Sequence, residues 1–167
     1  MYQKILVALE GSKQDEAVLD HARKLASCDC TEIALLIVIE HSPITLSRES
    51  VNLNPESPAF RADAVAEWEE TEDYLRALKE KMAADKFAIS TGIIEGPASA
   101  SILQFARMQN ADLILLATHK SEEPQNTPLG CVAEGVICRA KVPVMFVPTR
   151  QFEIPLRRQS KLVMGRN

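Results

Sequence analysis

The stretch Asp112-Leu-Ile-Leu-Leu-Ala-Thr-His-Lys120 decides the fold, together with Leu129-Gly-Cys-Val-Ala-Glu-Gly-Val-Ile137, to which a polar run connects it. The apolar run Leu113 to Ala117 is too short to span a membrane and suits a strand buried on both faces. Gly130 then opens a segment whose apolar residues have helical spacing: Val132, Val136 and Ile137. The stretch therefore predicts a strand, a loop and a helix. In open parallel sheets ligands bind at such a junction, where the helix dipole and free N–H groups favour an anion.

Four further apolar runs have the length and composition of buried strands, and segments with helical periodicity separate them. We expect strands at 4–9, 32–40, 87–94, 113–117 and 142–147. We expect helices from Ser12 to about Ser27, at 59–85, from Gly96-Pro97 and from Gly130. The strict alternation predicts an α/β fold: an open, doubly wound, five-stranded parallel sheet with helices on both faces and right-handed crossovers.

The segment 59–85 is the longest predicted helix. Its apolar residues repeat at four-three spacing and predict one buried face: Ala64, Trp68, Thr71, Leu75, Leu78 and Met82. Its cluster of acidic residues, from Glu67 to Asp73, predicts a solvated face rather than a metal site. The polar, proline-containing stretch 41–58 before it predicts a long loop, which either covers a site or is simply solvated.

Composition favours one globular domain in a chain of 167 residues, with 46% hydrophobic and 25% charged residues. The net charge of −4 gives no general reason to bind nucleic acid or an anionic membrane. The first residues lead directly into a strand, without the layout of a signal peptide, so we expect a cytoplasmic protein. Four cysteines and three scattered histidines predict neither structural disulfide bridges nor a zinc site.

Taken together, these segments resemble the universal stress protein family. Lys4-Ile-Leu-Val-Ala-Leu-Glu-Gly-Ser12 resembles its first strand and turn, and Ala111–His119 its fourth strand. Gly130–Cys138 resembles its last helix, and Val142-Pro-Val-Met-Phe-Val147 its closing strand. The resemblance covers roughly residues 3–148. It implies the strand order 3-2-1-4-5, a nucleotide crevice between the first and fourth strands, and dimers that pair through the fifth.

The same resemblance identifies a candidate nucleotide site with an altered phosphate loop. ATP-binding members carry Gly-x-x-Gly, nine residues, and then Gly-Ser or Gly-Thr. The spacing is retained here, but the residues are Ala117, Lys120 and Gly130-Cys131. Alanine adds a methyl group where backbone approaches phosphate, lysine disfavours positive φ, and a thiol is a weak donor. The family's aspartate on the adenosine side corresponds to Glu10, and Val38 matches an apolar residue beside the base.

Two readings of this site follow. In the first, the chain is a nucleotide-binding regulatory module for ATP or another adenine nucleotide, with Glu10 on ribose or base and Gly130 with the Cys131 amide on phosphate. In the second, which we favour, ATP binding is lost or weakened and the protein acts through its dimer and partner contacts. The candidate binding residues are Glu10, Val38, Ala117, Thr118, His119, Lys120, Gly130, Cys131 and Val132. A catalytic dyad of His119 and Glu10 is a weaker alternative, and we expect no enzyme and no metal.

Two further expectations concern contacts outside that site. The exposed apolar edge at Val142–Val147 predicts a homodimer, because an uncovered edge strand is prone to pair. We divide the chain into a domain at 1–148 and a basic C-terminal extension at 149–167. The extension has four arginines and one lysine against one glutamate, a net charge of +4, which leaves −8 on residues 1–148. We expect its Phe152, Ile154 and Leu156 to pack on that acidic domain rather than bind nucleic acid.

Overall fold

The computed structural model describes residues 2–12, 15–26, 30–40, 58–85, 87–118 and 130–148. Strands and helices alternate along this part of the chain, as the sequence predicts. The elements are β1 (Lys4–Leu9), α1 (Asp15–Leu25), β2 (Glu32–Ile39), α2 (Pro58–Lys81), β3 (Ala88–Glu95), α3 (Ala98–Met108), β4 (Leu113–Thr118), α4 (Cys131–Ile137) and β5 (Val144–Pro148).

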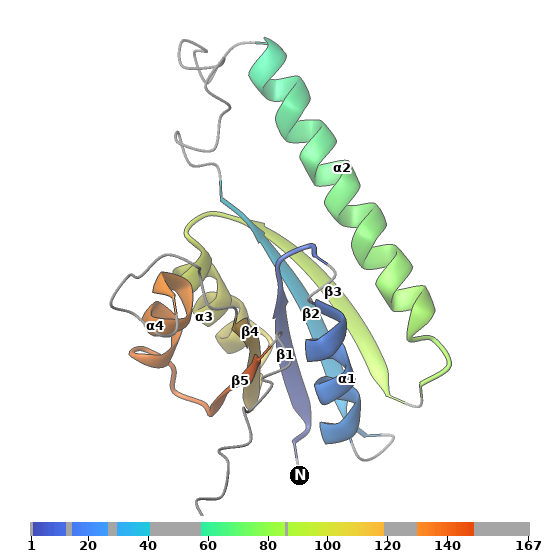
Figure 1. Cartoon of the computed structure of the whole chain (residues 1–167), viewed down its shortest axis with the longest axis vertical. Helices are drawn as coiled ribbons and strands as arrows, with labels where there is room; N and C mark the ends of the chain where they lie inside the picture. Colours follow the sequence, from blue (N-terminus) through green and yellow to red (C-terminus); the bar gives the residue numbers. More distant parts are fainter. Residues whose placement is uncertain are drawn as a thin grey trace, which may run out of the picture.

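The five strands form one parallel sheet in the order β3-β2-β1-β4-β5, which confirms the predicted fold class and strand order (Figure 1). β1 lies at the centre, where Val7 is aligned with Leu35 of β2 on one side and with Leu115 of β4 on the other. These residues are completely buried. Both faces of the sheet are covered, because strands this apolar need helices on each side.

Alternate residues of each strand build two cores, one on each face of the sheet. Val7, Leu35 and Leu115 belong to the core that α1 and α2 cover, and Leu6, Leu36 and Leu116 to the core that α3 and α4 cover. The first core receives Val18, Leu19 and Ala22 from α1, Leu75 and Leu78 from α2, and Met82 from the turn just after α2. The second receives Ile102, Leu103 and Ala106 from α3 and Val136 from α4.

The predicted apolar face of α2 is buried over only half of its length. Leu75, Leu78 and Met82 are 0–6% exposed, whereas Trp68 of the same face is 40% exposed, and Val65, outside the predicted face, is 56% exposed. The reason is length: 24 residues of helix span about 36 Å, and the eight-residue strands beneath span about 26 Å. The N-terminal part of α2 therefore projects beyond the sheet (Figure 1).

Some element boundaries and one covalent bond differ from the predictions. β5 runs from Val144 to Pro148 rather than over 142–147, and α3 begins at Ala98, with Pro97 as its N-cap, rather than at Gly96-Pro97. Cys30 is disulfide-bonded, so the expectation of no bridge is wrong for this residue, since pairing depends on geometry that spacing does not reveal. In the described part of the chain, no helix has the length and apolar character needed to cross a membrane.

Candidate functional site

The carboxyl ends of β1 and β4 lie side by side, as the candidate site requires. Ala8 of β1 is aligned with Leu116 of β4, so Glu10, just after β1, and Ala117, near the end of β4, lie at the same edge of the sheet. Glu10 is exposed directly after β1, and Gly11 follows it with a φ of 76°. A positive φ is accessible to glycine at little cost, so this residue type lets the chain turn sharply from β1 towards α1.

A second glycine begins the element that follows β4. Gly130 has φ 80° and ψ 154° and is the N-cap of α4, and the N–H of Glu134 donates to its carbonyl. A Cβ on Gly130 would meet nothing within 4 Å. Its backbone conformation, not lack of space, therefore requires glycine here. Cys131 is the first helical residue, exposed and without a disulfide.

The structure places the other candidates on different faces of the sheet. Val38 and Val132 both pack against the core that α3 and α4 cover, so they share a face. Ala117 packs against the opposite core, beneath α1 and α2. The backbone of Thr118 is paired with Pro148 at the end of the β4–β5 ladder. His119 and Lys120 lie outside the described residues, and with them the proposed dyad.

Glutamates stand at the ends of three neighbouring strands. Glu10 follows β1, Glu40 follows β2, and Glu95 is the last residue of β3. Adjacent strands lie about 4.8 Å apart, so these carboxylates share one short edge. The Glu40 carboxylate accepts a hydrogen bond from the N–H of Ala98, the first residue of α3, and so occupies a helix end that would otherwise attract an external anion.

Sequence reasoning selected Glu10 and missed Glu40 and Glu95. A signal was present, because each of these residues stands at the carboxyl end of a predicted strand. That position becomes informative only when the strands are neighbours in the sheet, which the order β3-β2-β1 establishes. Glu40 and Glu95 make the β3-β2-β1 side of the carboxyl edge acidic.

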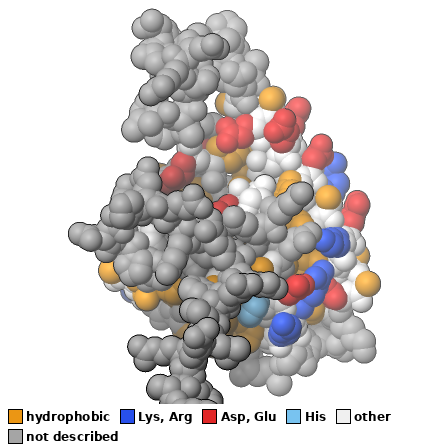
Figure 2. Space-filling model, in the orientation of Figure 1, with side chains coloured by type: hydrophobic (Ala, Val, Ile, Leu, Met, Phe, Trp, Pro, Cys, Tyr) orange, Lys and Arg blue, Asp and Glu red, His pale blue; other side chains and the backbone are white. Residues whose placement is uncertain are grey.

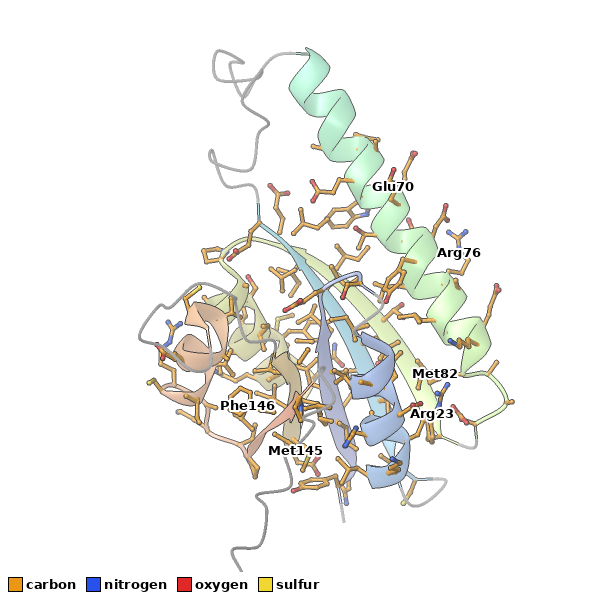
Figure 3. The ribbon with its side chains drawn as sticks, viewed as in Figure 1. Arg23, Glu70, Arg76, Met82, Met145 and Phe146 are labelled. Carbon is orange, nitrogen blue, oxygen red and sulfur yellow. The ribbon has the colours of Figure 1, made fainter. Side chains whose placement is uncertain are left out.

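Basic side chains gather at the opposite edge of the sheet. The last turns of α1, α2 and α3 carry Arg23, Lys24, Lys79, Lys81 and Arg107. Because each of these helices returns from the carboxyl edge, its last turn lies near the amino ends of the strands, as Arg23 does in Figure 3.

Carboxylates already engage Arg23, and also Lys4, the first residue of β1, at this amino edge. Arg23 Nε donates to Asp85 Oδ2 at 2.9 Å, a hydrogen bond that raises the pKa of Arg23 although burial opposes it. Lys4 Nζ lies 3.0 Å from Glu32 Oε2. In the part of the chain that the structure describes, no group of three or more His, Cys, Asp or Glu residues could hold a metal ion.

Comparison with known proteins agrees with the fold and the segment order. The model of the universal stress protein family matches residues 1–148. The chain belongs to the universal stress protein family. It is similar to universal stress protein MJ0531 of Methanocaldococcus jannaschii, with 29% identity over 147 residues that cover 88% of this chain and 82% of that protein.

Solved structures of other family members have the same fold. Universal stress protein UspA from Lactobacillus plantarum superposes with a TM-score of 0.70 and 21% identity over 87% of this chain and 97% of its own. The universal stress protein from Archaeoglobus fulgidus in complex with dAMP superposes with a TM-score of 0.58 and 17% identity, covering 87% and 98%. The resemblance of the sequence segments to this family is thereby confirmed.

Proposed function

We propose that this universal stress protein is a cytoplasmic, non-enzymatic regulator that acts through a homodimer and protein contacts, with ATP binding weaker than the family's glycine motif allows. The observation that carries the proposal is the acidic edge formed by Glu10, Glu40 and Glu95. The altered positions Ala117, Lys120 and Cys131 support it from the sequence.

The acidic edge opposes a triphosphate more than a monophosphate. Two unit charges about 10 Å apart interact by roughly 0.4 kcal/mol in bulk water, before screening by salt. Each further phosphate repeats this repulsion against each nearby carboxylate. At the same time, Cys131 offers a weaker donor than the family's Ser or Thr at the start of α4. Both effects lower the affinity for ATP more than the affinity for AMP, because ATP has more phosphate groups to bind.

A nucleotide with a single phosphate is therefore the second candidate. The Archaeoglobus fulgidus protein with dAMP, and a universal stress protein solved with cAMP, show that this fold accommodates adenine monophosphates in those proteins. In this chain Val38 and Val132 share the face on which a base would pack. Glu10 would accept hydrogen bonds from ribose hydroxyls, a role that its negative charge favours. In this alternative the contacts to base and ribose are retained, and fewer contacts to phosphate are needed.

Calorimetric titration of the full chain with ATP and with AMP tests both candidates. We expect ATP to bind more weakly than AMP. We expect the triple variant Ala117→Gly, Lys120→Gly, Cys131→Ser to increase ATP affinity, because it restores the glycine spacing and the hydroxyl donor. Cys138→Ser, an exposed cysteine just after α4, is the matched control and leaves both affinities unchanged. ATP binding by the parent chain as tight as that of the triple variant would contradict the proposal.

Dimerisation is proposed at β5, one of the two edge strands of the described sheet. Val144, Met145 and Phe146 are only partly buried in the single chain, although all three are apolar. An apolar edge with unpaired backbone groups pairs readily with a second copy. Pairing around a twofold axis covers both edges at once, which gives the segment Val142–Val147 an isologous partner.

A further inference from the structure

The charge of α2 is divided along the helix axis. Residues 64–73 contain five acidic residues, from Glu67 to Asp73, and no lysine or arginine, whereas residues 74–81 carry three basic residues and one acidic residue. These acids stand in the middle of α2, whose first turn carries none, so the helix dipole does not account for them. Acidic side chains gather where α2 projects, and basic ones lie lower on the same flank (Figure 2).

Two exposed apolar side chains, Val65 and Trp68, lie among these acids. Val65, Trp68 and Glu72 are spaced by three and four residues and share one side of the helix, and Glu69 lies four residues from Val65. All four are exposed, although Glu72 makes a long ion pair with Arg76 at 3.7 Å. We name these four residues the α2 patch. It combines a large aromatic surface with carboxylates, on the half of α2 that projects beyond the sheet (Figure 1).

We propose that the α2 patch binds the C-terminal extension, residues 149–167, of the same chain. The extension has the complementary chemistry. It carries a net charge of +4, with Arg157, Arg158 and Lys161 close together, and it places Phe152, Ile154 and Leu156 at alternate positions before them. Apolar side chains cover Val65 and Trp68, while the guanidinium groups bind Glu69 and Glu72, since arginine pairs well with carboxylates.

The end of β5 brings the extension within reach. β5 ends at Pro148, at the same carboxyl edge beyond which α2 projects. α2 packs over β2 and β3, and β2 lies three strand spacings from β5, about 14 Å. The eight residues from Thr149 to Leu156 span about 26 Å when extended. Leu156 and the paired arginines, at the far end of this span, can therefore contact α2 without any rearrangement of the sheet.

Charge distinguishes the extension from the other segment near α2. Residues 41–57, which join β2 to α2, contain one arginine and two glutamates, a net charge of −1. A weakly acidic segment has no electrostatic reason to lie against five acids, whereas a segment with a charge of +4 has. The acidic patch therefore selects the C-terminal extension as its occupant.

Trp68 is the only tryptophan of the chain, so its fluorescence reports directly on the α2 patch. Acrylamide quenching of the full chain at low salt measures how far Trp68 is covered. We expect Arg157→Glu, Arg158→Glu to raise the quenching constant to the value that the parent chain reaches in about 1 M salt, where the Debye length is about 3 Å. Reversing the helix charges as well, with Glu69→Lys and Glu72→Lys, should restore the protection.

Matched controls keep the result specific. Glu80→Lys makes the same charge change as Glu69→Lys on the same helix, eleven residues further along and outside the α2 patch, and should leave quenching unchanged. Equal quenching in the parent chain and in the double arginine variant would overturn the proposal. So would protection gained by mixing the double arginine variant with a Trp68→Phe chain, because the occupant would then be the extension of a second copy.

Discussion

Substituting Val144 with proline tests the dimer at the level of single hydrogen bonds. Pro143 accepts a hydrogen bond from the N–H of Ile114, so the backbone groups of Pro143 face β4. Because these groups alternate along a strand, the N–H groups of Val144 and Phe146 point away from the sheet, towards the open edge. Val144→Pro therefore removes an outward donor and leaves the β4–β5 ladder intact.

The expected loss follows from the symmetry of the interface. Each lost N–H counts twice in an isologous pair, and a hydrogen bond contributes about 0.5–1.5 kcal/mol net, so the dimer weakens by about 1–3 kcal/mol, roughly 5- to 150-fold. Sedimentation equilibrium measures the dissociation constant. Val144→Ala is the control, because it shortens the same side chain but keeps the N–H. The reasoning is refuted if both variants dimerise equally well, or if the parent chain is monomeric at micromolar concentration.

Two further predictions concern the stability of the sheet. A Cβ on Gly92 would lie 2.7 Å from Phe105 Cζ, so Gly92→Ala should lower the free energy of unfolding by about 1 kcal/mol, and adding Phe105→Leu should recover part of that loss in urea denaturation. Burial raises the pKa of Glu32, but hydrogen bonds from Ser90 and Lys4 outweigh it and lower the pKa overall. Stability from these bonds is present above the unfolded-state pKa, about 4.3, and is lost as pH falls through the folded-state value. Ser90→Ala should therefore destabilise by about 1 kcal/mol at neutral pH and by less in acid, with no change in this difference between pH 3 and pH 7 as the contradicting result.

The fold was predictable because its signals are local and repeated. Each strand is a continuous apolar run, each connection is long enough for a helix, and strict alternation of the two permits few topologies. The strand order came from resemblance to the family rather than from periodicity. The boundaries of β5 were less predictable, because Pro143 and Pro148 could each lie just inside or just outside the end of an edge strand.

The candidate site was only partly predictable. Gly130 was identified from the spacing of a loop motif, and its positive φ gives a physical reason for glycine there. The sequence did not reveal that Ala117 and Val38 belong to opposite faces of the sheet, because face depends on the register of each strand. Glu40 and Glu95 were missed because their proximity arises from strands that are neighbours in space.

The error on α2 is itself informative. Periodicity predicted one continuous buried face, and the sheet covers only the part from Leu75 onwards. A four-three stripe that continues past the end of its support leaves Trp68 exposed, with Val65 exposed beside it, and burying such side chains contributes about 1.5–3 kcal/mol each. The projecting part of α2 gains no stability from these two side chains unless something else covers them. A second contact surface, formed by a segment that is both basic and apolar, accounts for the stripe and for the acids around it. At Trp68 the predicted burial is therefore not supplied by the sheet, and under our proposal the C-terminal extension is its partner instead.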